Sequence, residues 1–88
     1  MTYPERNKKI LEPIIQLVDE LSAEHDKYTS SSKLMKDAEW EAYIRSMDNI
    51  SRKRKGTKIY DIAQYIEQYF LDDTEFVQKE LRKINDKL

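Results

Sequence analysis

Apolar side chains recur along this chain at every third or fourth position, and a single glycine in 88 residues interrupts the pattern. A repeat of three to four residues places side chains on one face of an α-helix, whereas a half-buried strand alternates with a period of two. Tight hairpins depend on glycine and similar turn residues, and this chain has one Gly and two Pro. The spacing therefore predicts an all-α fold, in which helices joined by short turns form a small antiparallel bundle.

The first predicted helix has a broad apolar surface. Two adjoining rows of side chains together span roughly 160° of its circumference, which is wider than the stripe of a helix lying on a protein surface. The rows are Ile10, Ile14, Leu17 and Leu21, and beside them Leu11, Ile15 and Val18. We expect this helix to pack between two neighbours, and we expect Pro13 to kink it.

The next segment allows two interpretations. The hydroxyl residues of TSSSK, residues 29–33, are expected to form a loop and to cap a second helix. The apolar side chains after this loop fall on two opposite faces: Leu34, Met35, Ala38 and Ala42 on one, and Trp40, Tyr43, Ile44, Met47 and Ile50 on the other. The segment is either one helix bent or interrupted near Asp37, which we favour, or a short helix followed by another from Ala38.

Two more helices are expected in the last third of the chain. Gly56 is placed to end the second helix in a left-handed conformation, and Thr57 is placed to cap the third. The motif DDTE, residues 72–75, has the acidic character of a helix start and predicts a separate fourth helix. The chain is thus predicted to be a single domain over residues 1–88, with four helices, or five if the second is broken.

Composition excludes several kinds of site. The chain has no cysteine, so disulfides and thiolate metal centres are not available, and its single histidine, His25, is expected to be exposed near a helix end. The sequence contains none of the phosphate-loop, zinc-protease or calcium-loop motifs, so we expect no enzymatic activity and no cofactor. It also has no apolar run of about 18 residues and no signal-peptide core, which predicts a cytoplasmic protein without membrane contact.

Cations are concentrated just before and after the glycine. Five lie within seven residues: Arg52, Lys53, Arg54, Lys55 and Lys58. The helix dipole favours cations at a helix C-terminus, so part of this run is explained as a charged turn. Five cations exceed what capping requires, and Tyr65 and Tyr69 follow at the edge of the next apolar stripe. Tyrosines are enriched at protein interfaces, so we predict that these seven residues bind another protein, one with an acidic surface.

The segment after the glycine suggests an alternative partner. The string TKIYDIAQYI, residues 57–66, resembles the first helix of helix-turn-helix repressors of the lactose-repressor type through Thr57, Ile59, Tyr60, Asp61, Ile62 and Ala63. In that family a glycine usually follows the alanine by four residues, a position that Glu67 occupies here. The resemblance implies a DNA-binding unit over residues 57–88, with a recognition helix that presents Lys79, Arg82, Lys83 and Lys87.

A last apolar row consists of Val77, Leu81, Ile84 and Leu88. This row is explained by packing against the first helix or by a homodimer. Taken together, these features indicate a small non-enzymatic regulatory or protein-interaction module. In size and expected helix content the chain is also similar to the four-helix immunity proteins that protect bacteria from pediocin-like bacteriocins, an analogy of fold alone.

Overall fold

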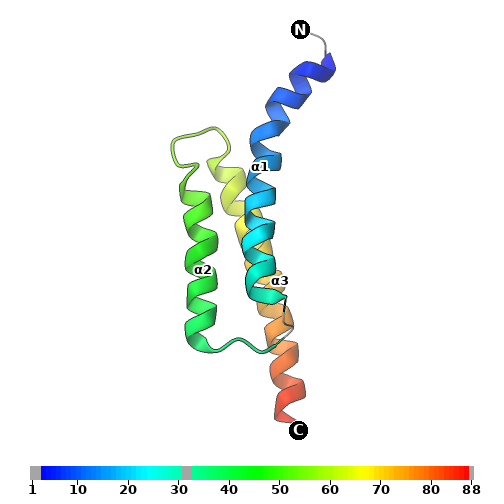
Figure 1. The fold of residues 1–88 in the computed structure, drawn as a ribbon, viewed down its shortest axis with the longest axis vertical. Coiled ribbons are helices and arrows are strands. Elements are labelled where there is room, and N and C mark those ends of the chain that lie inside the picture. Colours follow the sequence, from blue (N-terminus) through cyan, green and yellow to red (C-terminus); the bar gives the residue numbers. More distant parts are fainter. Residues whose placement is uncertain (1–2, 31–32, 88) are drawn as a thin grey trace.

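The computed structural model describes residues 3–30 and 33–87, with side chains from residue 7 onward. The elements in these ranges are three helices, α1 (Tyr3–Thr29), α2 (Asp37–Arg52) and α3 (Tyr60–Asp86). Helices α1 and α3 run in the same direction and α2 runs antiparallel to both (Figure 1). The predicted all-α class is confirmed for the described part of the chain, but the predicted number of four or five helices is wrong.

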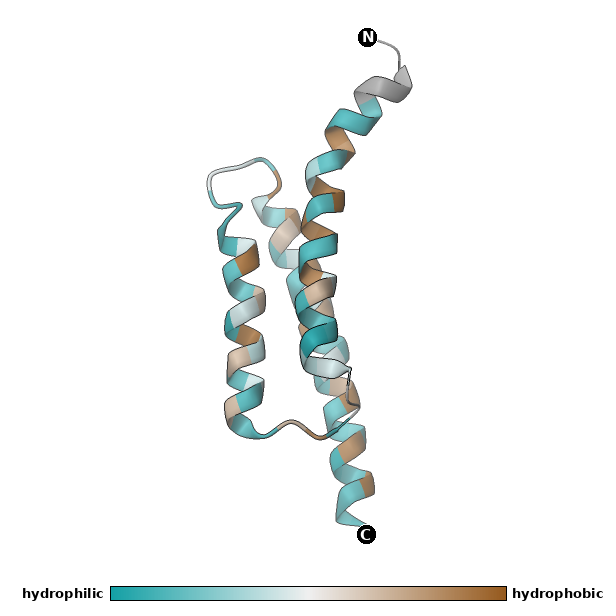
Figure 2. Ribbon diagram, in the orientation of Figure 1, coloured by the Kyte–Doolittle hydropathy of each residue, from teal (hydrophilic) through white to brown (hydrophobic). Residues whose placement is uncertain are grey.

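The bundle is elongated because its helices differ in length. Helices α1 and α3 have 27 residues each, whereas α2 has 16. The start of α1 extends beyond the bundle at one end and the end of α3 extends beyond it at the other (Figure 1). The radius of gyration is 16.1 Å, compared with about 12 Å for a compact domain of this length. Apolar residues continue along both extensions (Figure 2).

Helix α1 continues through Pro13, which removes one backbone hydrogen bond from the helix. The turns before the proline lean away from the axis of the rest of α1 (Figure 1). This lean carries the N-terminal end of α1 away from the other two helices.

Residues 33–36 are not helical, and α2 begins only at Asp37. The backbone N–H of Met35 donates to Oε1 of Gln78 at 2.7 Å, and Nε2 of Gln78 donates to the carbonyl of Lys33 at 3.3 Å. Because the backbone of this segment is hydrogen-bonded to α3 and the Met35 side chain is buried, its apolar residues do not form a helical face. Both interpretations of a helix before Asp37 are therefore wrong.

The hydroxyls of residues 29–33 do not begin α2, because its N-cap residue is Lys36. Ser31 and Ser32 lie outside the described residues. Thr29 instead donates its hydroxyl to the His25 carbonyl at 2.8 Å, within α1.

The turn between α2 and α3 differs from its prediction in detail. Gly56 has a left-handed conformation with φ of 84°, as expected, but α2 ends at Arg52, four residues earlier. Ile59, and not Thr57, occupies the N-cap position of α3, without a capping hydrogen bond from its side chain. Thr57 instead closes the turn by donating its hydroxyl to the Arg54 carbonyl at 2.6 Å.

The motif at residues 72–75 lies in the middle of α3 and does not start a new helix. Thr74 is buried, and its hydroxyl donates to the carbonyl of Phe70 at 2.7 Å. Asp72, Asp73 and Glu75 are exposed on the same turns. The acidic signal thus arises from the solvent side of a continuous helix.

The continuity of α3 also corrects the helix-turn-helix geometry implied for residues 57–88. In the described part of this segment, Tyr60–Asp86 is one helix without the internal turn that such a unit needs.

All three helices contribute to the core, and the α1–α2 connection adds one residue. Tyr43 of α2 lies at its centre, fully buried, with the rings of Tyr28 and Trp40 at 5.6 and 5.7 Å between centroids. The buried apolar residues are Leu17, Leu21, Met35, Tyr43, Met47, Ile50 and Ala63. Because α2 lies against both long helices, its apolar side is covered along its length.

Candidate functional site

Arg54, at the centre of the cationic turn, is a structural residue. Its side chain is only 12% exposed; Nη2 binds the carboxylate of Glu20 on α1, and Nη1 donates to the carbonyl of Ile50 at 2.9 Å. That carbonyl belongs to the last turn of α2, where the helix leaves carbonyls without partners. Arg54 therefore closes the end of α2 and attaches it to α1.

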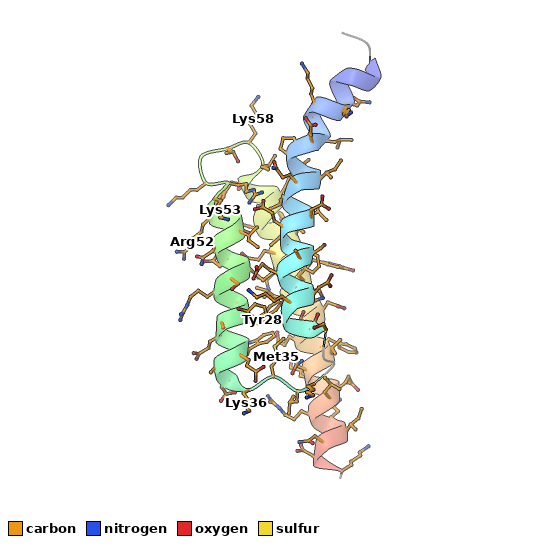
Figure 3. All side chains as sticks on the ribbon, in the orientation of Figure 1. Tyr28, Met35, Lys36, Arg52, Lys53 and Lys58 are labelled. Atoms are coloured by element: carbon orange, nitrogen blue, oxygen red, sulfur yellow. The ribbon has the colours of Figure 1, made fainter. Side chains whose placement is uncertain are left out.

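The other four cations are exposed. Nε of Arg52 pairs with Asp48 at 2.7 Å, and Nζ of Lys53 lies 3.9 Å from Glu20. Neither Lys55 nor Lys58 has an ion pair with any described residue. Lys58 projects from the turn, away from the helices (Figure 3). The turn thus leaves two unpaired lysines available to a ligand.

Tyr65 and Tyr69 are strongly exposed, at 80% and 75%. They lie on the side of α3 opposite to its buried residues Ala63 and Glu67, as the helical repeat requires. Since Ala63 and Glu67 face α2, the tyrosines are directed away from the cations at the end of α2. The structure therefore does not bring the seven predicted residues together on one surface.

The four cations of the DNA-binding alternative lie along the last turns of α3. Two of them pair within the helix, Lys79 with Glu75 at 3.3 Å and Lys83 with Glu80 at 3.2 Å. Arg82 and Lys87 have no ion pair within the described part of the chain. This stretch therefore presents mixed charge.

The large exposed apolar side chains are concentrated on two of the three helices. Nine are exposed among the described residues, and all of them lie on α1 or α3: Ile10, Leu11, Ile15, Ile62, Tyr65, Tyr69, Phe76, Val77 and Ile84. The large apolar residues of α2, in contrast, are buried or half-buried. The exposed apolar surface is thus located away from α2.

By helical spacing, two rows of exposed and half-buried apolar side chains are directed toward the contact between α1 and α3. The α1 row is Leu11, Ile15 and Val18, and its spacing continues to His25 and Thr29; the α3 row is Ile62, Ile66 and Tyr69, and its spacing continues to Asp73 and Phe76. A pocket of about 310 Å³ lies between the helices, lined by His25 and Thr29 from α1 and by Asp73, Thr74 and Val77 from α3. Because the helical repeat extends both rows toward this pocket, we infer that they lie on the same side of the molecule. We call the surface formed by Leu11, Ile15, Val18, Ile62, Ile66, Tyr69 and Phe76 the α1–α3 face.

Of the α1–α3 face, only Tyr69 was among the site residues expected from the sequence. The sequence did indicate the α1 residues of this face, because the two apolar rows of the first helix are broader than one interface requires. In the structure Leu17 and Leu21 of one row are buried and Ile10 of the same row is exposed, as are Leu11 and Ile15 of the other row. The apolar surface of α1 is thus broad because it includes a buried part and an uncovered part.

A buried polar chain lies beneath the α1–α3 face and links the three helices. The hydroxyl of Tyr43 lies 2.9 Å from both Nδ1 of His25 and Oγ1 of Thr74. The His25 ring packs against Phe70 with centroids 5.0 Å apart. The expectation of an exposed His25 is therefore wrong, because this residue is half-buried in the contact between α1 and α3. Burial raises the pKa of the Tyr43 hydroxyl, although its hydrogen bond with Thr74 opposes the shift.

Glu67 places a carboxyl group in the contact between α2 and α3. It is 8% exposed, and its Oε1 has no hydrogen-bond partner among the described residues. Burial raises its pKa, and so does the charge of Asp48, whereas the nearby Ser51 hydroxyl and the charge of Arg52 lower it. Glu67 is thus a buried acid, and its neighbours only partly offset the cost of burying its charge.

No three His, Asp or Glu side chains among the described residues are grouped closely enough to hold a metal ion. No described helix combines the length and the apolar character needed to cross a membrane.

Comparisons with protein-family models, with curated proteins and with solved structures find no match to this chain.

Proposed function

We propose that this protein is a small non-enzymatic interaction module that binds another protein chain through the α1–α3 face. The observation that carries the proposal is that all nine large apolar side chains that are exposed among the described residues lie on α1 and α3. Exposed apolar patches that are contiguous and rimmed by polar residues mark interaction sites on proteins. Tyr69 and Phe76 are of the aromatic type enriched at the centres of interfaces.

The surface area supports the same proposal. A compact monomer of 10.6 kDa exposes about 5,500 Å². This chain exposes 6971 Å², roughly 1,500 Å² more than that expectation. A standard interface buries about 800 Å² on each partner. The excess is therefore large enough for one complete interface.

Lys55 and Lys58 extend the proposal to the partner's charge. Both are exposed without an ion pair among the described residues, and long-range attraction from such cations favours an acidic partner. We expect these lysines to affect the association rate and its salt dependence more than the affinity. A second copy of the chain is another candidate partner for the face.

The DNA-binding alternative is a separate hypothesis with weaker support, since the net charge is −1 and α3 lacks the internal turn. It predicts that affinity for duplex DNA falls by orders of magnitude between about 50 and 200 mM salt. Absence of binding at the lower salt concentration would remove it.

Affinity capture from the organism that encodes the chain tests the proposal. The tagged full chain is compared with an Ile15→Glu/Ile62→Glu variant, and retained proteins are quantified by mass spectrometry. We expect a stoichiometric partner to be lost with this variant, because a partner would have to bury the new carboxylates. A matched Glu41→Lys/Arg45→Glu variant on exposed positions of α2 is expected to retain the partner. Equal capture by all three proteins would contradict the proposal.

A further inference from the structure

Helices α1 and α3 lie level with each other along the α1–α3 face. Near one end of the face, Pro13 of α1 and Ile59 line a common hollow, and near the other end His25 and Asp73 line the pocket described above. The members of these pairs are 46 and 48 residues apart in the sequence. Because the separation hardly changes along α1, each residue of α1 lies level with the residue about 47 positions later in α3.

This register defines the shape of the face. Ile15 of α1 lies level with Ile62 of α3, and from Ile62 the face continues along α3 to Phe76, a rise of about 21 Å. One further turn in the other direction includes Leu11. A straight helix placed between α1 and α3 would contact both apolar rows over this whole length, because helices pack their side-chain ridges into the grooves of their neighbours.

Exposed carboxylates border the α1 side of the face. Glu12 and Asp19 lie one turn before and one turn after Ile15, and Asp26 lies two turns after Asp19. All three carboxylates are exposed, and none has an ion pair with a described residue. They are therefore available to cations of a partner.

The α3 side of the face is acidic as well. Asp72 and Asp73 are exposed between Tyr69 and Phe76, within about one turn of each. Neither has an ion pair within the described part of the chain, and Asp72 accepts a hydrogen bond from Gln68 at 2.8 Å. Five carboxylates thus flank the two apolar rows, and opposite charge on a partner favours association with such a surface.

Cations adjoin the face at one end only. Lys8 lies one turn before Glu12, and Lys58 lies one turn before Ile62. Both lysines are exposed without an ion pair to any described residue. Acidic residues at one end of a partner segment would meet these lysines, which agrees with the acidic group expected opposite Lys55 and Lys58.

We propose, building on the interaction function above, that the segment of the partner bound to the α1–α3 face is a basic amphipathic helix of about 18 residues. It lies on the side of α1 and α3 opposite to α2 and adds a fourth helix to the bundle. Its apolar side chains cover Leu11, Ile15, Ile62, Tyr69 and Phe76, and its lysines and arginines face the five carboxylates. An apolar groove that binds the apolar side of a helix is a recurrent mode of recognition.

The predicted row of Val77, Leu81, Ile84 and Leu88 contacts such a helix only in part. Val77 is exposed beside the α1–α3 pocket, and Leu81 is half-buried in the lining of this pocket. Ile84 is exposed beyond the level at which α1 ends. Leu88 lies outside the described residues. The homodimer expected from this row is a competing explanation, which sedimentation distinguishes from the helix proposal.

Titration of a fluorescein-labelled synthetic peptide with the purified full chain tests the proposal. The peptide has about 18 residues, with leucines at helical spacing, two glutamates in its first turn and lysines at its other polar positions. The control peptide has the same leucines and glutamates at all polar positions. Fluorescence anisotropy should give a micromolar dissociation constant for the basic peptide and one at least about tenfold higher for the acidic peptide.

Two results of this titration would overturn the proposal. If the basic peptide does not bind at about 100 μM protein, the face does not accept a basic amphipathic helix. If both peptides bind with the same affinity, the carboxylates do not select a basic partner.

Variants of the chain locate the bound peptide. Ile15→Ser/Ile62→Ser should raise the dissociation constant at least about 30-fold, because both apolar rows lose a contact. Asp26→Asn/Asp73→Asn should raise it about tenfold and reduce its salt dependence. The matched control, Glu41→Gln/Asp86→Asn, removes two exposed carboxylates outside the face and should bind normally. Equal affinities of all these proteins would place the peptide elsewhere and overturn the proposal.

Sedimentation velocity of the full chain alone distinguishes a second copy from a different partner. We expect a monomer at all micromolar concentrations. A dimer that Ile15→Ser/Ile62→Ser dissociates would overturn the helix proposal and assign the face to self-association.

The two proposals can fail separately. If the basic peptide does not bind but affinity capture finds a partner that Ile15→Glu/Ile62→Glu loses, the interaction function stands and the helical partner is wrong. If capture also finds no such partner and the chain is monomeric, both proposals fail.

Discussion

The buried polar chain consists of hydrogen bonds among His25, Tyr43 and Thr74. The direction of each bond follows from which of these groups has a hydrogen to donate. Thr74 has one hydroxyl hydrogen, and it donates this hydrogen to the carbonyl of Phe70 at 2.7 Å. Tyr43 must then donate to Thr74, and Nδ1 of His25 must donate to Tyr43. His25 therefore carries a proton on Nδ1, and one continuous chain of donors connects the three helices.

The Tyr43→Phe variant tests the contribution of this chain. Removing the hydroxyl leaves Nδ1 of His25 with only its longer contact to Oγ1 of Thr74, at 3.4 Å, which we expect to lower the free energy of unfolding by about 1–2 kcal/mol. Tyr28→Phe is the matched control, because its half-buried hydroxyl contacts only Ser46, at 3.1 Å, and its loss should be under about 1 kcal/mol. Urea unfolding followed by circular dichroism measures both values. Equal losses of unfolding free energy in the two variants would show that the Tyr43 hydroxyl stabilises the protein no more than an ordinary half-buried hydrogen bond does.

Glu67 predicts a dependence of stability on pH. Its pKa is raised in the folded state, so the folded protein binds more protons than the unfolded chain above about pH 4.5, the ordinary value. The contribution of Glu67 is therefore most favourable at acidic pH and is lost as the pH rises through the folded-state pKa. At pH 7 the buried carboxylate destabilises the contact between α2 and α3, near Asp48 and Arg52.

Replacing the acid with a neutral side chain of the same shape should remove this effect. We expect Glu67→Gln to stabilise the protein at pH 7 by roughly 1 kcal/mol, with a smaller gain at pH 5. Urea unfolding of both proteins at the two pH values measures the difference. The exposed Glu75 provides the control, Glu75→Gln, which should change stability little at either pH. A gain for Glu67→Gln that is the same at both pH values would contradict the proposed cause.

At the scale of elements, the end of α2 depends on a tertiary contact and not only on its turn sequence. Arg54 and Lys55 are adjacent cations of the same run, but only Arg54 reaches the last carbonyls of α2 and Glu20 of α1. The helix dipole favours both positions to a similar degree. The structure thus divides one charged run into a structural residue and an exposed one.

Methionine substitution distinguishes the two roles, since it keeps an unbranched side chain and removes the charge. We expect Arg54→Met to destabilise the protein by about 1–3 kcal/mol, because Glu20 and the Ile50 carbonyl lose a charged partner. Lys55→Met should change stability by less than about 0.5 kcal/mol. Thermal and urea unfolding check both. Similar effects from the two variants would show that the run acts only through its total charge.

At the scale of the whole molecule, the lengths of the helices determine which surfaces are exposed. Helix α2 is 11 residues shorter than α1 or α3, which follows from their 16 and 27 residues. Three helices of unequal length can enclose a core only along the stretch where all three lie side by side. The ends of α1 and α3 therefore retain apolar side chains in water, and burial by a partner is the direct way to remove them from solvent.

By itself, the sequence determined that the chain is helical, because the spacing of Leu17, Leu21, Tyr43 and Met47 is a local property of the chain. It also placed Gly56 in a left-handed conformation. Helix boundaries depended on contacts distant in sequence: Gln78 hydrogen-bonds the backbone of residues 33 and 35, and Thr74, in the middle of α3, is buried and hydrogen-bonded to Tyr43 of α2. Which apolar rows are covered depends on the packing of the helices, since periodicity assigns a side chain to a face and burial depends on whether another helix reaches that face.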